Sequence, residues 1–147
     1  MNEQLTKVHV DVPDNEDCSG ETIWAKYLGD NLYEIRSCPW FAKNLNWGDV
    51  VKAIAQSSDL KPSVLEVVRR SGHKTLRVIF FYQSTEADEK RISEKLTTMH
   101  AYHENAWPHF YAIDVETEGN YGDVCNYLWS LEQEGWLSYE TGATTEI

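Results

Sequence analysis

Apolar residues in the first half of the chain recur at every second position, in short runs that turn-forming residues separate. Val8, Val10 and Val12 show the pattern most simply, since they would share one face of a strand. Gly29-Asp30-Asn31, between two such runs, predicts a hairpin turn. The runs predict strands over residues 7–12, 22–28, 32–37, 49–56 and 64–71. Short strands at this spacing are typical of a small barrel or a strongly curved sheet.

In the second half, strands alternate with segments whose apolar residues recur every three or four positions. Thr85 and Asn120 are suited to cap two helices, and Gly135 is suited to end the second. The apolar stripe of the first helix consists of Ile92, Leu96, Met99 and His103. The pattern predicts strands over residues 75–82, 110–116 and 136–141, and helices over residues 85–102 and 121–134. Right-handed crossovers between these elements would place both helices on one face of a sheet.

The two patterns together predict an α+β fold. An N-terminal β-rich, barrel-like half would pack with a C-terminal ferredoxin-like half, whose helices cover one face of an antiparallel or mixed sheet. A chain of 147 residues is long enough for one domain, or for two small halves that share a core. We therefore expect a single domain over residues 1–147, with subdomains at approximately 1–74 and 75–147.

The charge of the chain is strongly negative and unevenly distributed. It carries 24 acidic and 13 basic residues, a formal net charge of −11. The last 52 residues contain nine acidic residues and no lysine or arginine, with eight Trp and Tyr residues interleaved. Nucleic acids and anionic membrane surfaces attract basic proteins, so the charge argues against both as partners. It favours fast association with a basic protein instead.

Targeting signals and cysteine usage indicate the compartment. No apolar run approaches the length of about 18 residues that a membrane-spanning helix needs. Residues 1–14 are polar and acidic, without the basic and apolar regions of a secretory signal. Cys18, Cys38 and Cys125 are odd in number and widely spaced, which does not suit a disulfide framework. We expect a cytoplasmic protein.

Six sequence blocks follow one another along nearly the whole chain in a recognisable order and spacing. They are Ile23-Trp24-Ala25, Tyr33-Glu34-Ile35-Arg36, Pro39-Trp40-Phe41-Ala42, Asn46-Trp47-Gly48-Asp49-Val50-Val51, the block from Val67 to Val78, and Gly135-Trp136-Leu137-Ser138-Tyr139-Glu140. In this arrangement the chain resembles a bacterial family catalogued as domain of unknown function 4265. The Gly-Asp-Val-Val block combined with the Ser-Gly-His block makes the resemblance fairly specific. It implies a small stand-alone bacterial protein and supplies no activity.

Candidate catalytic and metal-binding residues are few. In a helix, His100 and His103 would lie one turn apart and could share a metal with His109. The simpler interpretation is a solvated His100 and a His103 at the edge of the core, since no CxxC or HExxH motif accompanies them. Cys38 and His73 could form a thiol and its base, but a buried, inert cysteine is more common. We predict no catalytic residue, no metal and no cofactor.

Two glycine-containing blocks are predicted to shape turns. Glycine permits a positive φ, and aspartate readily accepts hydrogen bonds from nearby backbone, which suits Gly48-Asp49 and Ser71-Gly72-His73 at the ends of strands. A polar cluster in a cleft is the functional alternative for the same residues. The basic residues that surround the second block are expected to pair with the protein's own carboxylates. They are Lys61, Arg69, Arg70, Lys74 and Arg77.

The leading hypothesis is an acidic protein that neutralises a cationic protein partner, as an immunity protein blocks a bacterial toxin domain, commonly a nuclease. Its carboxylates would occupy the phosphate site of the toxin, while Trp129 or Trp136 anchors the interface. The predicted partner-binding residues are Asp114, Glu116, Asp123, Trp129, Glu132, Glu134, Trp136 and Glu140. Not all of these would share one face, so a contiguous surface would have to follow an edge.

Three alternatives stay open. A small-ligand-binding or regulatory module would use a pocket between the two halves, lined by Trp24, Trp47 or Tyr82. An enzyme would need Cys, His and carboxylate side chains that converge in space. The acidic residues could also serve only solubility, with the aromatic residues in the core.

Overall fold

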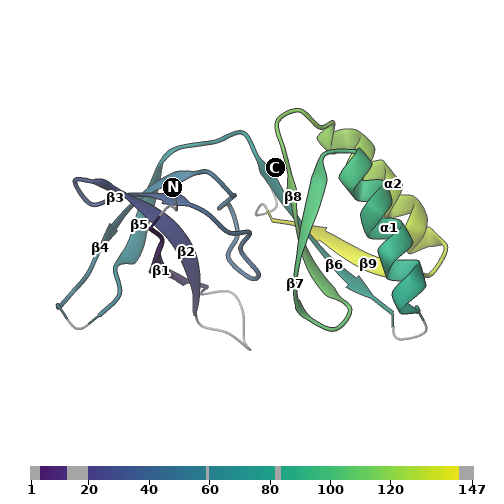
Figure 1. Ribbon diagram of the computed structural model, residues 1–147, viewed down its shortest axis with the longest axis horizontal. Coiled ribbons are helices and arrows are strands. Elements are labelled where there is room, and N and C mark those ends of the chain that lie inside the picture. Colours follow the sequence, from purple (N-terminus) through teal and green to yellow (C-terminus); the bar gives the residue numbers. More distant parts are fainter. Residues whose placement is uncertain (1–3, 13–19, 59, 82–83, 143–147) are drawn as a thin grey trace. The chain divides into compact units, whose positions relative to one another are not determined.

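The computed structural model describes residues 4–12, 20–58, 60–81 and 84–142. The chain forms two compact units, one comprising Met1–His73 with Gly142–Ile147 and the other Lys74–Thr141. The first is a closed five-stranded barrel and the second a four-stranded sheet with two helices (Figure 1). The predicted α+β class, with a barrel-like N-terminal half, is confirmed. Cys18 and Tyr82 lie outside the described residues.

The barrel consists of β1 (Thr6–Asp11), β2 (Gly20–Gly29), β3 (Leu32–Ile35), β4 (Val50–Ile54) and β5 (Ser63–Arg69). Neighbouring strands are antiparallel, and the barrel closes where β1 runs parallel to β5 at His9 and Ser63. Asp30 and Asn31 both have positive φ, which matches the twist of a two-residue hairpin turn between β2 and β3. The inward side chains form a buried core of Val8, Ile23, Ala25, Ile35, Leu45, Val51 and Ala53.

A buried carboxylate connects the loop before β4 to the end of β5. Asp49 is fully buried, and its carboxylate accepts hydrogen bonds from the backbone N–H of Asn46 (2.9 Å) and Ser71 (2.8 Å). The Arg70 guanidinium lies 3.2 Å from the same carboxylate. Gly48, at φ +86°, adopts the left-handed conformation that the tight turn requires. The prediction that Gly48-Asp49 and Ser71-Gly72-His73 shape turns is thus confirmed, and the two blocks are joined to each other.

A second carboxylate holds the loop that follows β3. The Glu21 side chain, on β2, accepts hydrogen bonds from three consecutive backbone N–H groups, those of Trp40 (2.9 Å), Phe41 (2.9 Å) and Ala42 (2.6 Å). The carboxylate thus satisfies three backbone N–H groups of a loop that lies outside the strands. The Pro39-Trp40-Phe41-Ala42 block is therefore a loop shaped around Glu21.

The second unit contains β6 (Lys74–Phe80), α1 (Glu86–Thr98), β7 (Ala101–Trp107), β8 (Phe110–Val115), α2 (Tyr121–Gln133) and β9 (Leu137–Thr141). The strand order β7-β8-β6-β9, all antiparallel, with both helices on one face, is the predicted ferredoxin-like arrangement (Figure 1). Its core lies between the helices and the sheet. The largest fully buried side chains there are those of Leu76, Val78, Ile92, Ile113, Val115, Val124, Leu128 and Leu137.

The predicted first helix was too long, and one strand was missed. The helix ends at Thr98, and His100 turns the chain with φ +61°, so that Ala101–Trp107 forms β7. His103 is consequently a strand residue and not part of the helical stripe. When a residue in the left-handed conformation ends a helix, that residue is usually glycine. Because histidine takes this position, the sequence contains no visible stop.

We expect Asp49→Ala to lower the free energy of unfolding by about 3 kcal/mol, because it leaves two partly buried N–H groups and the Arg70 guanidinium without this acceptor. Asp11→Ala removes a carboxylate that is 81% exposed and should change it by less than about 0.5 kcal/mol. Urea unfolding followed by tryptophan fluorescence measures both. Equal effects of the two substitutions would contradict the assigned role of Asp49.

Glu21→Ala should release the backbone of residues 40–42 without unfolding the barrel. We expect their amide hydrogens to exchange at least about tenfold faster, since each loses a hydrogen bond worth about 1 kcal/mol or more. The matched control is Glu34→Ala, whose carboxylate bonds to the Arg36 side chain. Hydrogen–deuterium exchange read by mass spectrometry resolves this loop. Unchanged exchange at residues 40–42 would show that Glu21 does not hold it.

Candidate functional site

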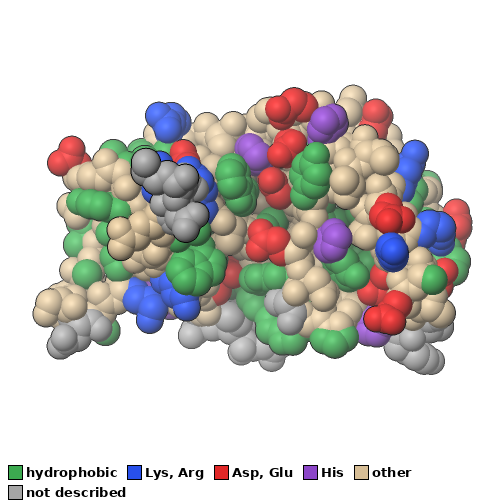
Figure 2. Space-filling model, viewed as in Figure 1, with side chains coloured by type: hydrophobic (Ala, Val, Ile, Leu, Met, Phe, Trp, Pro, Cys, Tyr) green, Lys and Arg blue, Asp and Glu red, His purple; other side chains and the backbone are tan. Residues whose placement is uncertain are grey.

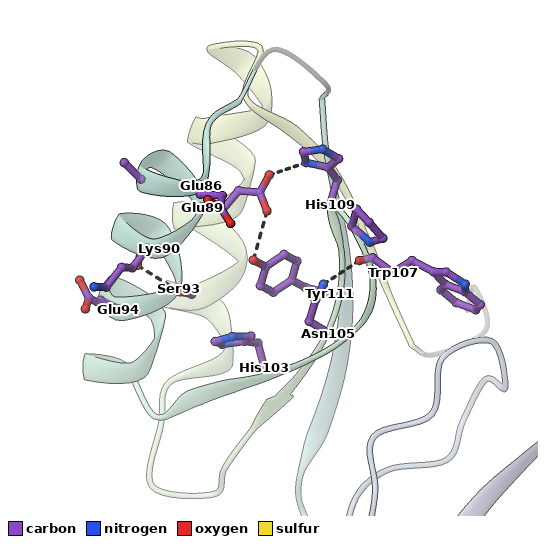
Figure 3. Close-up of a pocket in the computed structure, with 12 residues that line it drawn as sticks. Glu86, Glu89, Lys90, Ser93, Glu94, His103, Asn105, Trp107, His109 and Tyr111 are labelled. Atoms are coloured by element: carbon purple, nitrogen blue, oxygen red, sulfur yellow. Dashed lines mark hydrogen bonds and ion pairs between the residues drawn. The ribbon is translucent and has the colours of Figure 1, made fainter.

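The C-terminal unit contains a cleft of about 880 Å³ between α1 and the β7–β8 hairpin (Figure 3). Its size falls in the usual range for small-ligand sites, about 300–1,000 Å³. Helix α1 supplies one wall, β7 and β8 supply the other, and the turn between these two strands closes one end. The lining residues are Glu86, Ala87, Glu89, Lys90, Ser93, Glu94, His103, Asn105, Trp107, Pro108, His109 and Tyr111.

The start of α1 is fixed by a capping box. The Thr85 side chain accepts a hydrogen bond from the Asp88 backbone N–H (3.1 Å), and the Asp88 carboxylate accepts one from the Thr85 N–H (3.0 Å). Hydrogen bonds to Thr85 hold the pKa of Asp88 below its ordinary value. This cap places Glu89 one turn into the helix, on the side that faces the sheet.

Glu89 is a buried carboxylate at the centre of a side-chain network. It is 7% exposed, so its oxygens need donors from the protein. Ser84 Oγ donates to one oxygen (2.9 Å) and Tyr111 Oη donates to the other (3.1 Å). His109 Nδ1 is also hydrogen-bonded to Glu89. The carboxylate therefore joins α1 to β8 and to the β7–β8 turn.

Tyr111 and His103 form the strand wall of the cleft. Burial, together with the hydrogen bond to Glu89 and its charge, raises the pKa of Tyr111 to about 12, so the phenol stays protonated and donates. The His103 ring lies 4.9 Å from the Tyr111 ring, tilted by 43°. Desolvation by partial burial lowers the pKa of His103, which leaves its imidazole neutral at neutral pH.

Asn105 shapes the hairpin turn at the end of the cleft. Its Nδ2 donates to the carbonyl oxygens of Trp107 (2.7 Å) and Phe110 (2.8 Å). The register between β7 and β8 shifts at this point, and His109 adopts φ +69° in the turn. The Asn105 amide thus replaces strand pairing where the ladder is irregular.

Three of the predicted partner-binding residues are away from the helices. Pairing places Asp114 opposite Thr75, and Glu140 opposite Arg77, on the sheet face that the helices do not cover. Glu140 Oε1 lies 3.8 Å from the buried Arg77 guanidinium. Glu116 follows β8, with Oε1 3.8 Å from His100 Nδ1. The Glu140 and Asp49 contacts confirm that Arg77 and Arg70 pair with the protein's own acids.

The other five predicted residues belong to α2 and its C-terminal end. Trp129 is 55% exposed on the outer side of α2. Asp123 is exposed in the first turn, and the Glu132 carboxylate accepts from the Tyr139 N–H (3.2 Å). Trp136 Nε1 donates to Glu134 (3.3 Å). The predicted set of eight is therefore divided between two faces.

Trp136 differs from its predicted position. In the predicted strand over residues 136–141, alternation would put Trp136 on the sheet face opposite Leu137, but β9 begins only at Leu137. Trp136 precedes the strand and packs against the core between helices and sheet. The Arg91 guanidinium lies 5.9 Å from its ring centre. Alternation does not apply to a residue outside the strand, which explains the error.

The three histidines considered for a metal site do not have the assumed helical spacing, because α1 ends before His100. Among the described residues, no three His, Cys, Asp or Glu side chains are grouped as metal ligands would be. Cys38 is fully buried, and the His73 ring packs against Trp47 with the ring centres 5.2 Å apart.

No helix in the described ranges is long and apolar enough to cross a membrane.

Trp24 and Trp47, two of the residues predicted to line a ligand pocket, both belong to the barrel unit. Trp24 is 45% exposed beside a shallow depression of about 490 Å³, with the Lys7 ammonium 4.8 Å from its ring centre. The Trp47 ring packs against the His73 ring, and the Arg36 guanidinium lies 5.6 Å from the Trp47 ring centre.

The network of Glu89, His109 and Tyr111 was not predicted from the sequence. One signal was present: Glu89 starts the buried stripe of α1, which continues through Ile92, Ser93 and Leu96 at helical spacing. An acid on the apolar side of a helix must find donors, which marks it as unusual. Two of its partners, His109 and Tyr111, lie 20 and 22 residues further along the chain, and no local pattern identifies them.

Comparison with known proteins gives the family and the fold. The family model described as domain of unknown function (DUF4265) matches residues 21–139. The crystal structure of a hypothetical protein from Neisseria gonorrhoeae is similar over 100% of both chains, with a TM-score of 0.79 and 15% sequence identity. No curated protein matches. The family match runs from β2 into β9, and the chain belongs to the DUF4265 family, whose function is unknown.

Proposed function

We propose that this protein binds a basic protein partner through the outer face of α2, in the manner of an immunity protein that neutralises a cationic toxin domain. The observation that carries the proposal is Trp129, which is 55% exposed on a helix without a single basic residue. Tryptophan is the residue most enriched at the energetic centres of protein interfaces. An exposed one in acidic surroundings suits a partner of opposite charge.

Charge supports the choice of partner. Between Lys74 and Thr141 the chain has twelve acidic and five basic residues, and no basic residue after Lys95. Over the elements of the C-terminal unit, Figure 2 shows acidic side chains at many points of the visible face, with fewer Lys and Arg between them. Such a surface accelerates the approach of a cationic protein through long-range attraction.

The carboxylates of α2 lie on both sides of Trp129. Successive helical residues rotate by about 100°, so Asp123 and Glu134 fall on the flank that carries Tyr127, and Glu132 falls on the opposite flank. The Tyr127 flank faces α1, since Arg91 and Glu134 both influence the pKa of Tyr127, which burial raises. Glu132 bonds to Tyr139 on β9. An aromatic centre with acidic flanks matches the usual layout of an interface.

Asp114 and Glu140 are left out of this surface, because they lie on the sheet face that the helices do not cover. Glu116 is left out as well, since it lies at the end of β8 beside His100. The proposed contact surface consists of Asp123, Trp129, Glu132, Glu134 and Trp136. Its carboxylates would fill the site at which a nuclease-type toxin holds phosphate, so that binding competes with substrate.

The proposal predicts a partner that can be isolated and measured. Affinity purification of the tagged protein from its source cells at low salt should retain a protein of net positive charge. With that purified partner, the association rate constant should fall at least about tenfold between 50 and 300 mM NaCl. Trp129→Ala should accelerate dissociation about 30-fold, the equivalent of about 2 kcal/mol.

Charge reversal provides the matched comparison. Asp123→Lys with Glu134→Lys should slow association at least about tenfold. Asp11→Lys with Glu66→Lys changes the net charge equally on exposed strands of the barrel and should slow it much less. Trp24→Ala is the corresponding control for Trp129→Ala. Salt-independent association, or equal losses from the α2 and barrel variants, would refute the proposed surface.

A further inference from the structure

The cleft between α1 and the β7–β8 hairpin contains a carboxamide whose orientation is fixed. Both protons of Asn105 Nδ2 are donated to backbone carbonyls, those of Trp107 and Phe110. A carboxamide oxygen cannot donate to a carbonyl, so the amide cannot be flipped. The described residues supply no donor to Asn105 Oδ1. On the strand side, the cleft therefore presents an acceptor.

The opposite wall also presents acceptors. Glu86 and Glu94 are exposed on α1 and line the cleft, with Lys90 between them as the single cation of that wall. Figure 3 shows Glu86 beside Glu89 at the end of the cleft that the His109 turn closes. The Glu89 carboxylate is already satisfied by its three donors. A ligand would therefore meet the carboxylates of Glu86 and Glu94 on the helix and Oδ1 of Asn105 on the strand.

Between the walls lies a pair of flat rings. His103 and Tyr111 are 4.9 Å apart and tilted by 43°, and both line the cleft. The neutral His103 imidazole does not repel a cation. Ring faces carry partial negative charge, which attracts a cation placed over them. Flat rings favour a flat cation over a spherical one.

We propose that this cleft binds a guanidinium group. A guanidinium is planar, so it stacks on ring faces, and its five N–H donors point in several directions within one plane. It can form a paired hydrogen bond with a carboxylate on one wall while it donates to Asn105 on the other. An ammonium lacks the plane and the spread of donors, a neutral group would leave the charge of Glu86 and Glu94 uncompensated, and an anionic group would be repelled by it.

The guanidinium could belong to a free small molecule or to an arginine side chain of another protein. The site does not rest on the proposed function, because it involves α1 and the β7 edge of the sheet, whereas α2 lies over the β9 edge. Substitutions on α2 leave it intact. Either proposal can consequently fail while the other holds.

Titration of the full-length protein, followed by NMR, tests the site with three probes. Butylguanidine represents a free guanidinium compound, and N-acetyl-arginine methylamide represents an arginine within a protein; each carries a single positive charge. The neutral citrulline analogue of the second probe has nearly the same shape. We expect at least one guanidinium probe to shift the signals of His103 and the Asn105 side-chain amide, with an affinity at least tenfold above that of the citrulline analogue.

The two guanidinium probes distinguish the sources of the ligand. Tighter binding of butylguanidine would identify a free small molecule, and tighter binding of the capped arginine would identify a protein side chain. Failure of both to bind, or equal binding of the citrulline analogue, would overturn the proposal. Shifts confined to residues outside the cleft would overturn it too.

Substitutions locate the binding in the cleft. Glu86→Gln with Glu94→Gln should weaken guanidinium binding at least tenfold without disturbing the core, since both side chains are exposed. Asn105→Ala should weaken it at least tenfold as well, although it also loosens the turn. Glu66→Gln with Glu118→Gln removes two exposed carboxylates elsewhere and should change the affinity less than twofold. Equal affinity for the Glu86/Glu94 variant and the unaltered protein would exclude this site.

Discussion

Asp49 has no contact with solvent, and its carboxylate accepts hydrogen bonds from two backbone N–H groups, with the Arg70 guanidinium beside it. Burying a charge is costly unless donors surround it, so Asp49 fixes where β4 begins and β5 ends. The same constraint recurs at Glu21, which shapes the loop after β3, and at Glu89, which joins α1 to the β7–β8 hairpin. Each accepts hydrogen bonds from donors that lie outside the strand ladders.

Much of the fold follows from local patterns. Alternation located nearly every strand, the Asn120 cap located α2, and the positive-φ residues Asp30 and Asn31 marked a hairpin. The exception is β7, which is an edge strand with polar residues and follows a helix that ends without glycine or proline. An edge strand is stabilised by one neighbour, so its sequence needs little apolar character. Its existence follows from the complete sheet and not from its own residues.

The candidate sites divide in the same way. The acidic, aromatic character of the C-terminal half is visible in composition, and Trp129 could be named as a candidate interface anchor from the sequence. The cleft could not be predicted, because it depends on a carboxylate in α1 that meets His109 and Tyr111 some 20 residues later. That Asp114 and Glu140 lie on a different face from the α2 residues could be seen only from the register of β6 with β8 and β9.

Helix α2 and its acidic flanks form the surface that we propose meets a basic protein. Hydrogen–deuterium exchange, compared between the free protein and its complex with the co-purified basic partner, tests it most directly. We expect slower exchange in Tyr121–Gln133 and in the residues that lead into β9, with the five barrel strands unchanged. Protection confined to the barrel strands, with α2 unaffected, would contradict it.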